Sequence, residues 1–369
     1  MDIAKAFDTV SHAKLATVVK SYGINSEVCQ WIKEFLSNRY QQVCVGDAVS
    51  SPVSVSSGVP QGGVIGPLLF VIYIDGLMKF ISNSTRDVML KLFADDSKLY
   101  GDESASLQEA INAFFAWTKN RQLRVAPQKC FHLSLHKNRS LTNPETFTIN
   151  ATTIENKTSV CDLGIIVNEN MKWKQHCDYI YRKASQTSYQ ILKCFGTRNI
   201  WVLIHLFKTY IRPKLEFNSS VWSPYLKKDI ARIESVQKRF TRYSFLRCGL
   251  TFSSYTDRLR QVNLQTLEER RLITDLVLLF KIVNDMSDMK FLDYFVFNRT
   301  NYNLRRNSLQ ISPLKNHNSD QWTNSFFVRV TRVWNTLPEE IVKASSLSKF
   351  KSLIVKHDVS NFITLDSTY

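Results

Sequence analysis

One continuous apolar segment, residues 64–81, restricts the possible folds more than any other feature of this sequence. It is apolar on most sides and long enough for a helix, and Pro67 is tolerated in the first turn of such a helix. Because a helix that is hydrophobic all round has to be buried, we expect this one to pack beneath a sheet. The segment therefore favours an α+β fold, in which helices and strands share one core.

Strand patterns lie on both sides of this helix. Valines alternate with polar residues over residues 40–56, around Gly46-Asp47, which predicts a hairpin. Residues 88–100 are typical of a strand, a tight turn and a second strand, with Asp95-Asp96 at the turn. Short strands are expected again over residues 122–168. Together these strands predict a small antiparallel sheet.

Amphipathic helices are predicted between the strands. One begins after Ser11 and ends at Gly23, and the next is capped by Asn25 or Ser26. The buried stripe of this second helix is expected to consist of Val28, Trp31, Ile32, Phe35 and Leu36. Ser106 and Glu109 predict a capping box at the start of a later helix, and helical patterns dominate from His176 onward.

Positive charge is concentrated in one part of the chain. The net charge is +16, yet residues 1–171 carry 16 basic and 16 acidic side chains. Residues 172–247 carry 16 basic and 4 acidic side chains, so most of the excess lies there. Such a field is typical of a protein that binds a polyphosphate, because each neutralised phosphate releases counterions. The alternative is a solvated helical surface without a partner.

Several classes of protein do not fit the sequence. The uninterrupted apolar stretch from Val64 to Ile74 is shorter than the roughly 20 residues that cross a bilayer, so no membrane partner is expected. No apolar core of a secretory signal follows Met1, which predicts an intracellular protein of the nucleus or cytoplasm. The seven cysteines form no CxxC pair, and we expect reduced thiols packed in cores.

Three carboxylates mark a candidate metal site. Asp2 opens the segment Asp2-Ile3-Ala4-Lys5-Ala6-Phe7-Asp8, and Asp95-Asp96 lies on the predicted hairpin turn. Carboxylates are hard oxygen ligands that suit Mg²⁺, and two such ions can promote an in-line phosphoryl transfer. Because Asp2 and Asp95 are 93 positions apart, only a fold that places one strand beside the hairpin could unite them. An Asp-Asp pair at a turn is by itself more often turn chemistry.

The conjunction of these segments resembles the reverse transcriptases of non-LTR retrotransposons, particularly the jockey-like elements. The resemblance covers nearly the whole chain and runs through Phe7-Asp8 with His12, Gly58-Val59-Pro60-Gln61-Gly62 with Gly66-Pro67-Leu68-Leu69-Phe70, Phe93-Ala94-Asp95-Asp96, Leu163-Gly164 with Trp173 and His176, and Trp334-Asn335-Thr336-Leu337-Pro338 with Phe350-Lys351. It implies a right-hand polymerase palm over residues 1–168, a basic helical thumb over 169–248 and a helical C-terminal segment over 249–369. The implied enzyme is an RNA-directed DNA polymerase, a nucleotidyltransferase.

The resemblance also implies ligands for this enzyme. Two Mg²⁺ ions, with Mn²⁺ as an alternative, would be held by Asp2, Asp95 and Asp96 and by the Ile3 carbonyl. The partners would be an RNA template, a DNA primer and deoxynucleotide triphosphates. The oligomeric state is left open.

The remaining site residues follow from the same resemblance. Phe7 matches the bulky residue that excludes a ribose 2′-hydroxyl, although packing in the palm core is its alternative role. Gln61, Gly58 and Gly62 would lie against the template and the incoming nucleotide, where glycines permit close approach of the backbone. Lys129 matches a lysine proposed as the general acid for pyrophosphate, and its alternative is an ordinary solvated side chain.

The sequence departs from this family pattern at its start. In the family a fingers region precedes the strand that carries the metal-binding aspartate, which here is residue 2. We therefore expect an N-terminally truncated form, with a frayed strand at Asp2 and impaired polymerase activity. Two other hypotheses stay open. One is a catalytically inactive nucleic-acid-binding remnant of a retroelement, and the other is a scaffold whose basic segment meets an acidic protein.

Overall fold

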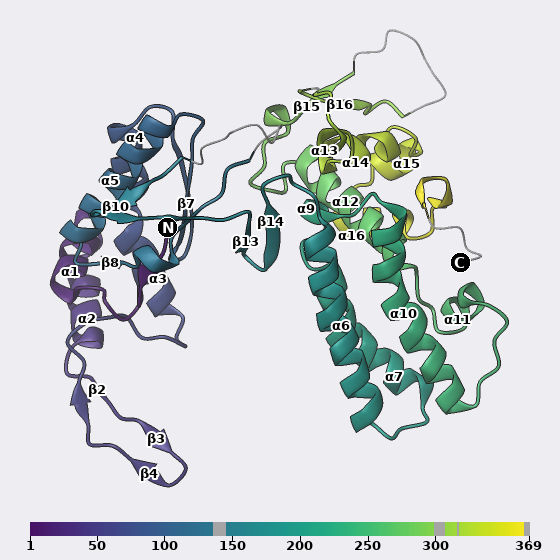
Figure 1. The fold of residues 1–369 in the computed structure, drawn as a ribbon, viewed down its shortest axis with the longest axis horizontal. Coiled ribbons are helices and arrows are strands. Elements are labelled where there is room, and N and C mark those ends of the chain that lie inside the picture. Colours follow the sequence, from purple (N-terminus) through teal and green to yellow (C-terminus); the bar gives the residue numbers. More distant parts are fainter. Residues whose placement is uncertain (136–144, 299–306, 316, 365–369) are drawn as a thin grey trace. The chain divides into compact units, whose positions relative to one another are not determined.

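The chain forms two compact units, each with its own core, and each is described separately (Figure 1). The structure is a computed structural model that describes residues 1–135, 145–298, 307–315 and 317–364. Unit 1 is Met1–Val160 and unit 2 is Cys161–Tyr369. The predicted palm boundary at residue 168 thus lies inside unit 2, and the two segments predicted beyond it share that unit.

Unit 1 mixes short strands with helices, as expected for an α+β fold. Its helices are α1 His12–Ser21, α2 Ser26–Leu36, α3 Ile65–Ile74, α4 Gly76–Ser84 and α5 Ser104–Asn120, with a 3₁₀ turn η1 at Pro127–Lys129. Its strands are β1 Ile3–Ala4, β2 Tyr40–Gln41, β3 Cys44–Val45, β4 Ala48–Val49, β5 Val53–Ser54, β6 Met89–Phe93, β7 Asp96–Tyr100, β8 Arg124–Val125, β9 Phe131–His132, β10 Thr148–Ile149, β11 Thr152–Thr153 and β12 Glu155–Asn156.

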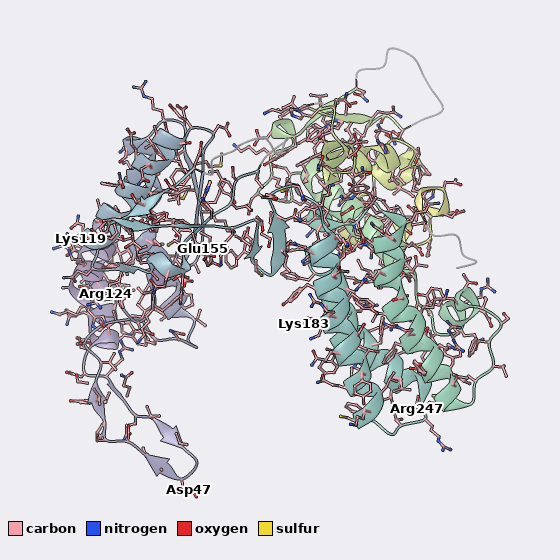
Figure 2. All side chains as sticks on the ribbon, in the orientation of Figure 1. Asp47, Lys119, Arg124, Glu155, Lys183 and Arg247 are labelled. Atoms are coloured by element: carbon pink, nitrogen blue, oxygen red, sulfur yellow. The ribbon has the colours of Figure 1, made fainter. Side chains whose placement is uncertain are left out.

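The strands of unit 1 pair as short two-stranded ladders. The ladders β1–β8, β2–β5, β3–β4, β6–β7 and β10–β11 are antiparallel, as predicted, whereas β12 pairs with β9 in parallel. Both predicted hairpins are confirmed. β2 to β5 form an arm whose strand residues are all exposed, with Asp47 at its tip (Figure 2).

Two details of the helices differ from the prediction. In α2 only Ile32 and Leu36 of the expected stripe are buried, because this helix packs mainly on α1. Trp31 and Phe35 stack on each other on the exposed side, with ring centroids 5.5 Å apart. The predicted capping box of Ser106 and Glu109 is also wrong, because α5 begins two residues before Ser106. The Ser106 hydroxyl donates to the Glu103 carboxylate instead.

The apolar segment forms α3 and α4, and its buried face contributes Phe70, Tyr73 and Leu77 to the core of unit 1. The opposite side carries exposed Leu68 and Val71, so the segment is not buried all round as predicted. The helical stretch extends to Ser84, beyond the Val64–Ile74 stretch whose short length led us to expect no membrane partner. By length and composition alone, Ile65–Ser84 could cross a membrane, although a core helix passes the same test.

Unit 2 is mostly helical. Its helices are α6 Lys174–Cys194, α7 Ile200–Leu206, α8 Arg212–Glu216, α9 Ser219–Trp222, α10 Lys227–Cys248, α11 Tyr255–Gln261, α12 Leu267–Val283, α13 Asp320–Thr323, α14 Phe326–Trp334, α15 Glu339–Val342 and α16 Leu347–Ile354, with a π-helical turn η2 at Phe207–Ile211 and 3₁₀ turns η3 Phe291–Asp293 and η4 Ser360–Phe362. Its strands are β14 Ile165–Asn168, β15 Phe295–Phe297 and β16 Ile311–Pro313, and β13, Ser159–Asp162, begins just before the unit.

Two large aromatic side chains organise the cores of unit 2. Trp222 is buried where α6, η2 and α10 meet, and Trp334 is buried among α12, α14 and α16. All seven cysteines are free thiols, as expected. Only Cys130 and Cys177 are buried, however, and Cys44, Cys161 and Cys194 are exposed, so the expectation that the thiols pack in cores is wrong for most of them.

Candidate active site

The hairpin that carries Asp95 and Asp96 lies beside the strand that follows Asp2. The Met1 amino group donates to the Ser97 carbonyl at 2.7 Å, and the Ser97 amide donates to the Met1 carbonyl at 3.3 Å. Such a reciprocal pair is the hydrogen-bonded pair of an antiparallel ladder. Asp2 directly follows this pair on its strand and Asp96 directly precedes it on the hairpin, so the two residues lie next to each other. The predicted meeting of strand and hairpin is thereby confirmed.

The other edge of this strand is held by β8 and the residues that follow it. The Ala126 amide donates to the Asp2 carbonyl at 3.0 Å, and the Asp2 amide donates to the Cys130 sulfur at 3.3 Å. The frayed strand expected at Asp2 is therefore wrong, because hydrogen bonds hold it on both edges. Since alternate residues of a strand direct their backbone groups to opposite edges, the Ile3 carbonyl lies on the same edge as the Met1 carbonyl, which faces the hairpin that carries Asp95.

Charges converge on the Asp2 side chain. Burial raises the pKa of Asp2, the nearby carboxylates of Asp95 and Asp96 raise it further, and the Lys129 ammonium opposes them. The three predicted metal ligands and the predicted general acid are thus near neighbours. The turn between β6 and β7 is unusual. Ala94, directly before Asp95, has a φ of +53°, a left-handed conformation that residues with a side chain seldom adopt.

This group of oxygens fits a divalent cation in its chemistry. Carboxylates on facing strands repel each other, and a cation between them removes that repulsion. Burial is the main cause of the raised pKa of Asp2, and the neighbouring Asp95 and Asp96 carboxylates add to it. In the described residues no three Asp, Glu, His or Cys side chains converge closely enough to hold a metal ion as they stand. The oxygen donors have the chemistry of a divalent-cation site, but among the described residues their side chains are not gathered into one.

A loop centred on Gly58 packs against the turn that follows β1. The Gly58 amide donates to the Val10 carbonyl and the Val59 amide donates to the Phe7 carbonyl, both at 2.8 Å. Gly58 has a φ of +88°, and a Cβ built on it would lie 2.7 Å from the Asp8 carbonyl oxygen. Only glycine fits this close approach of two backbones. The loop places the predicted substrate residues beside the segment that begins with Asp2.

Three side chains for which the sequence predicted no role, His12, Arg39 and Asp8, hold this loop. His12 Nε2 lies 2.8 Å from the Gly58 carbonyl, to which Arg39 also donates at 3.0 Å. The predicted substrate residue Gln61 donates from Nε2 to the Asp8 carboxylate at 2.9 Å. Asp8 and Gln61 are both exposed, so this bond orients an amide that remains accessible. Gly62, with a φ of +89°, is exposed next to it.

Phe7 lies at the edge of the core of unit 1. Its ring stacks on Phe70, with centroids 4.4 Å apart and planes 22° apart, and it is partly exposed. This position satisfies the packing role and leaves one part of the ring accessible. The proposed exclusion of a 2′-hydroxyl by Phe7 stays a prediction.

The basic segment of unit 2 exposes both cations and aromatic rings on long helices. Figure 2 labels two of its basic residues, Lys183 on α6 and Arg247 near the end of α10. Arg232 and Arg239 of α10 both lie over the ring of Tyr181 on α6, at 4.6 and 5.3 Å from its centroid. Of the aromatic residues in this segment, Phe207, Trp222 and Phe240 are buried in the core, whereas Trp201, Tyr210 and Tyr243 are exposed.

Comparison with known proteins agrees with this geometry. The family described as reverse transcriptase (RNA-dependent DNA polymerase) matches residues 1–197, which include unit 1 and α6. The RNA-directed DNA polymerase from the mobile element jockey of Drosophila melanogaster is 25% identical over 254 residues, which are 66% of this chain and 27% of that protein. The probable RNA-directed DNA polymerase from transposon BS of the same species is 26% identical over 296 residues, 73% of this chain and 31% of that protein.

A third relative comes from a different kind of element. The Pol polyprotein from the type-1 retrotransposable element R2 of Popillia japonica is 27% identical over 142 residues, 36% of this chain and 23% of that protein. The chain spans less than a third of the length of these three relatives. The matched part includes the strand, hairpin and loop described above. The chain belongs to the reverse transcriptase family and is similar, within it, to the RNA-directed DNA polymerases of jockey and related mobile elements.

Proposed function

We propose that this chain acts as an RNA-directed DNA polymerase that extends a DNA primer on an RNA template with deoxynucleotide triphosphates. The observation that carries the proposal is the pairing of Met1 with Ser97, which brings Asp2 beside Asp95 and Asp96 from 93 positions away. Membership of the reverse transcriptase family supports the same reaction. Loss of primer extension on substitution of Asp95 tests the proposal.

In the proposed mechanism, the carboxylates of Asp2, Asp95 and Asp96 and the Ile3 carbonyl would hold two Mg²⁺ ions, with Mn²⁺ as an alternative. Such ions, when bound, activate a primer 3′-hydroxyl and stabilise charge on the leaving pyrophosphate. Lys129 holds a proton at Nζ for that pyrophosphate, a contribution worth about 10² to 10⁴-fold in rate. The proximity of Lys129 to Asp2 supports this role, because both would face the same triphosphate.

Substrate positioning falls to the Gly58 loop in this proposal. The exposed backbone at Gly62 permits a nucleotide to approach closely, and Asp8 holds the Gln61 amide in place for the template or the incoming base. Residues 169–248 serve as a thumb whose basic helices contact the primer–template backbone, and residues 249–369 support that thumb through the shared core of unit 2.

Phe7 should exclude ribonucleotides by its bulk. Replacing it with alanine removes the ring that would meet a 2′-hydroxyl, so incorporation of ribonucleotides relative to deoxynucleotides should rise by about 10²-fold. The measurement is primer extension with each kind of nucleotide in separate reactions. Phe7→Tyr keeps the ring and the stack on Phe70, and it should leave the ratio near that of the wild type. An unchanged ratio in Phe7→Ala would assign Phe7 to packing alone.

The basic helices of unit 2 should bind nucleic acid with a steep dependence on salt. We expect the logarithm of the affinity for a primer–template duplex to fall with the logarithm of salt concentration at a slope of about −4 or steeper, for four or more neutralised phosphates. Lys183→Gln with Lys193→Gln should reduce that slope by about 2, because each lysine lost removes about one phosphate contact.

The control for this experiment lies in unit 1. Lys20→Gln with Lys119→Gln removes two exposed cations from the charge-balanced part of the chain and should leave the slope unchanged. Binding that is insensitive to salt would contradict the thumb assignment and favour the scaffold hypothesis. Steep binding without any primer extension would favour the inactive remnant.

A further inference from the structure

A polar cavity of about 410 Å³ in unit 2 lies outside the elements assigned to catalysis. It is formed by η2, α8, the loop that precedes α12 and the first turn of α12. Its polar lining consists of Lys208, Arg212, Asn263, Gln265, Glu269 and Arg270. The volume falls within the range of pockets that hold small molecules or single nucleotides, about 300 to 1,000 Å³.

The π-helical turn η2 forms one wall of this cavity. Pro213 has no amide proton, and its ring crowds the carbonyl of Thr209 one turn earlier. The helix widens here, and the Arg212 amide donates to the Phe207 carbonyl five positions back. π-Helical turns occur frequently at functional sites. Lys208 of this turn and Arg212, the first residue of α8, both line the cavity.

Positive charge in the cavity exceeds what its neighbours neutralise. Arg270 donates to both oxygens of the Glu216 carboxylate and so occupies it, while the Nε of Arg212 lies 3.7 Å from the same group. Burial and the neighbouring Arg270 lower the pKa of Arg212, and Glu216 offsets this only in part. The Lys208 ammonium has no hydrogen bond or ion pair to any residue that the structure describes.

The cavity lining also contains one carboxylate, which would repel a bound anion. Glu269 lines the wall and accepts a hydrogen bond from the Gln265 amide at 2.6 Å. Burial raises the pKa of Glu269, which reflects a negative charge held at a cost. The cavity lining therefore holds three cations and the Asn263 amide but only one carboxylate, Glu269. Glu216 lies outside the lining, where Arg270 binds it in a bidentate manner.

We propose that this cavity binds a phosphate monoester, such as the terminal 5′-phosphate of a nucleic-acid strand. A monoester carries about two negative charges and three terminal oxygens, so it matches a cavity lined by one lysine and two arginines. A phosphodiester within a strand carries one charge and is flanked by sugars, which hinders its entry into a concave pocket. This site is separate from the proposed catalytic centre and does not depend on the polymerase function.

The experiment compares two short single-stranded oligonucleotides of one sequence, one with a 5′-phosphate and one with a 5′-hydroxyl, on the full chain. We expect the 5′-phosphate to strengthen binding by about tenfold. Lys208→Gln and Arg212→Gln should each abolish most of that difference. Lys214→Gln is the matched control, because Lys214 is exposed on the same helix as Arg212 yet does not line the cavity. It should keep the full difference.

A parallel titration with inorganic phosphate, followed by calorimetry, separates the two sources of the ligand. Phosphate binding that is lost in Lys208→Gln, without any preference between the oligonucleotides, would keep the anion site and assign it to a free phosphate. Equal affinity for both oligonucleotides together with no binding of phosphate would overturn the proposal, as would a preference that survives in both cavity variants. Melting temperatures near that of the wild type show that the variants fold. Failure of primer extension has no bearing on either titration.

Discussion

Replacing Asp95 by asparagine should lower primer extension on an RNA template by about 10³-fold. The change removes one negative charge from the group that Asp2, Asp95 and Asp96 form, and an amide binds Mg²⁺ less strongly than a carboxylate does. Metal-held charge supplies much of the stabilisation in phosphoryl transfer, so its loss affects the rate more than the binding of the primer. The measurement is the single-turnover rate of extension with saturating template and nucleotide.

Asp47→Asn is the matched control for this variant. Asp47 lies at the tip of the exposed β2–β5 arm, so the same chemical change there should leave the rate within about twofold of the wild type (Figure 2). Extension by Asp95→Asn at the wild-type rate would contradict the metal assignment. Absence of extension by the wild-type chain would contradict the polymerase proposal for this chain and favour the remnant hypothesis.

Gly58→Ala should destabilise unit 1 by about 3 kcal/mol. A residue with a side chain is strained at a φ of +88°, and the added Cβ would overlap the backbone of Asp8 at 2.7 Å. Neither backbone can move without breaking the bonds from Gly58 to Val10 and from Val59 to Phe7. Urea denaturation followed by circular dichroism measures the loss, and primer extension should fall with it because the loop carries Gln61.

Gly63→Ala tests the same chemical change a few positions away. Gly63 has ordinary backbone angles, and a Cβ built on it meets no atom within 4 Å. We expect the free energy of unfolding to change by less than about 0.5 kcal/mol. Equal stabilities of the Gly58 and Gly63 variants would show that the loop does not pack on Asp8 as described.

Local patterns were sufficient to predict the elements whose signals lie within a few residues. The hairpin of β6 and β7 and the helix α1 follow from turn residues and apolar spacing, and the structure confirms both. The exposed side of α2 could not be predicted in this way. The apolar stripe of α2 is present, but the part of it that is buried depends on how much of α2 is covered by α1.

In the candidate site, too, some residues could be predicted from the sequence and others could not. Resemblance to the family identified Asp2, Asp95, Asp96 and Lys129, and the structure places them near one another. The bonds that hold the Gly58 loop had no local signal, because Asp8 and Gln61 are 53 positions apart and Arg39 lies 19 positions from Gly58. Hydrogen bonds between residues far apart in the sequence can be identified only in the folded structure.

Separate cores have a consequence for the thermodynamics of this chain. A small domain with one core unfolds in a single cooperative transition, whereas a chain whose parts have their own cores need not do so. A substitution such as Gly58→Ala then shifts only the portion of the denaturation curve that belongs to unit 1, and one midpoint does not describe the whole molecule. The stability of the proposed catalytic unit and that of the basic helical unit are two quantities, which mutation can change independently.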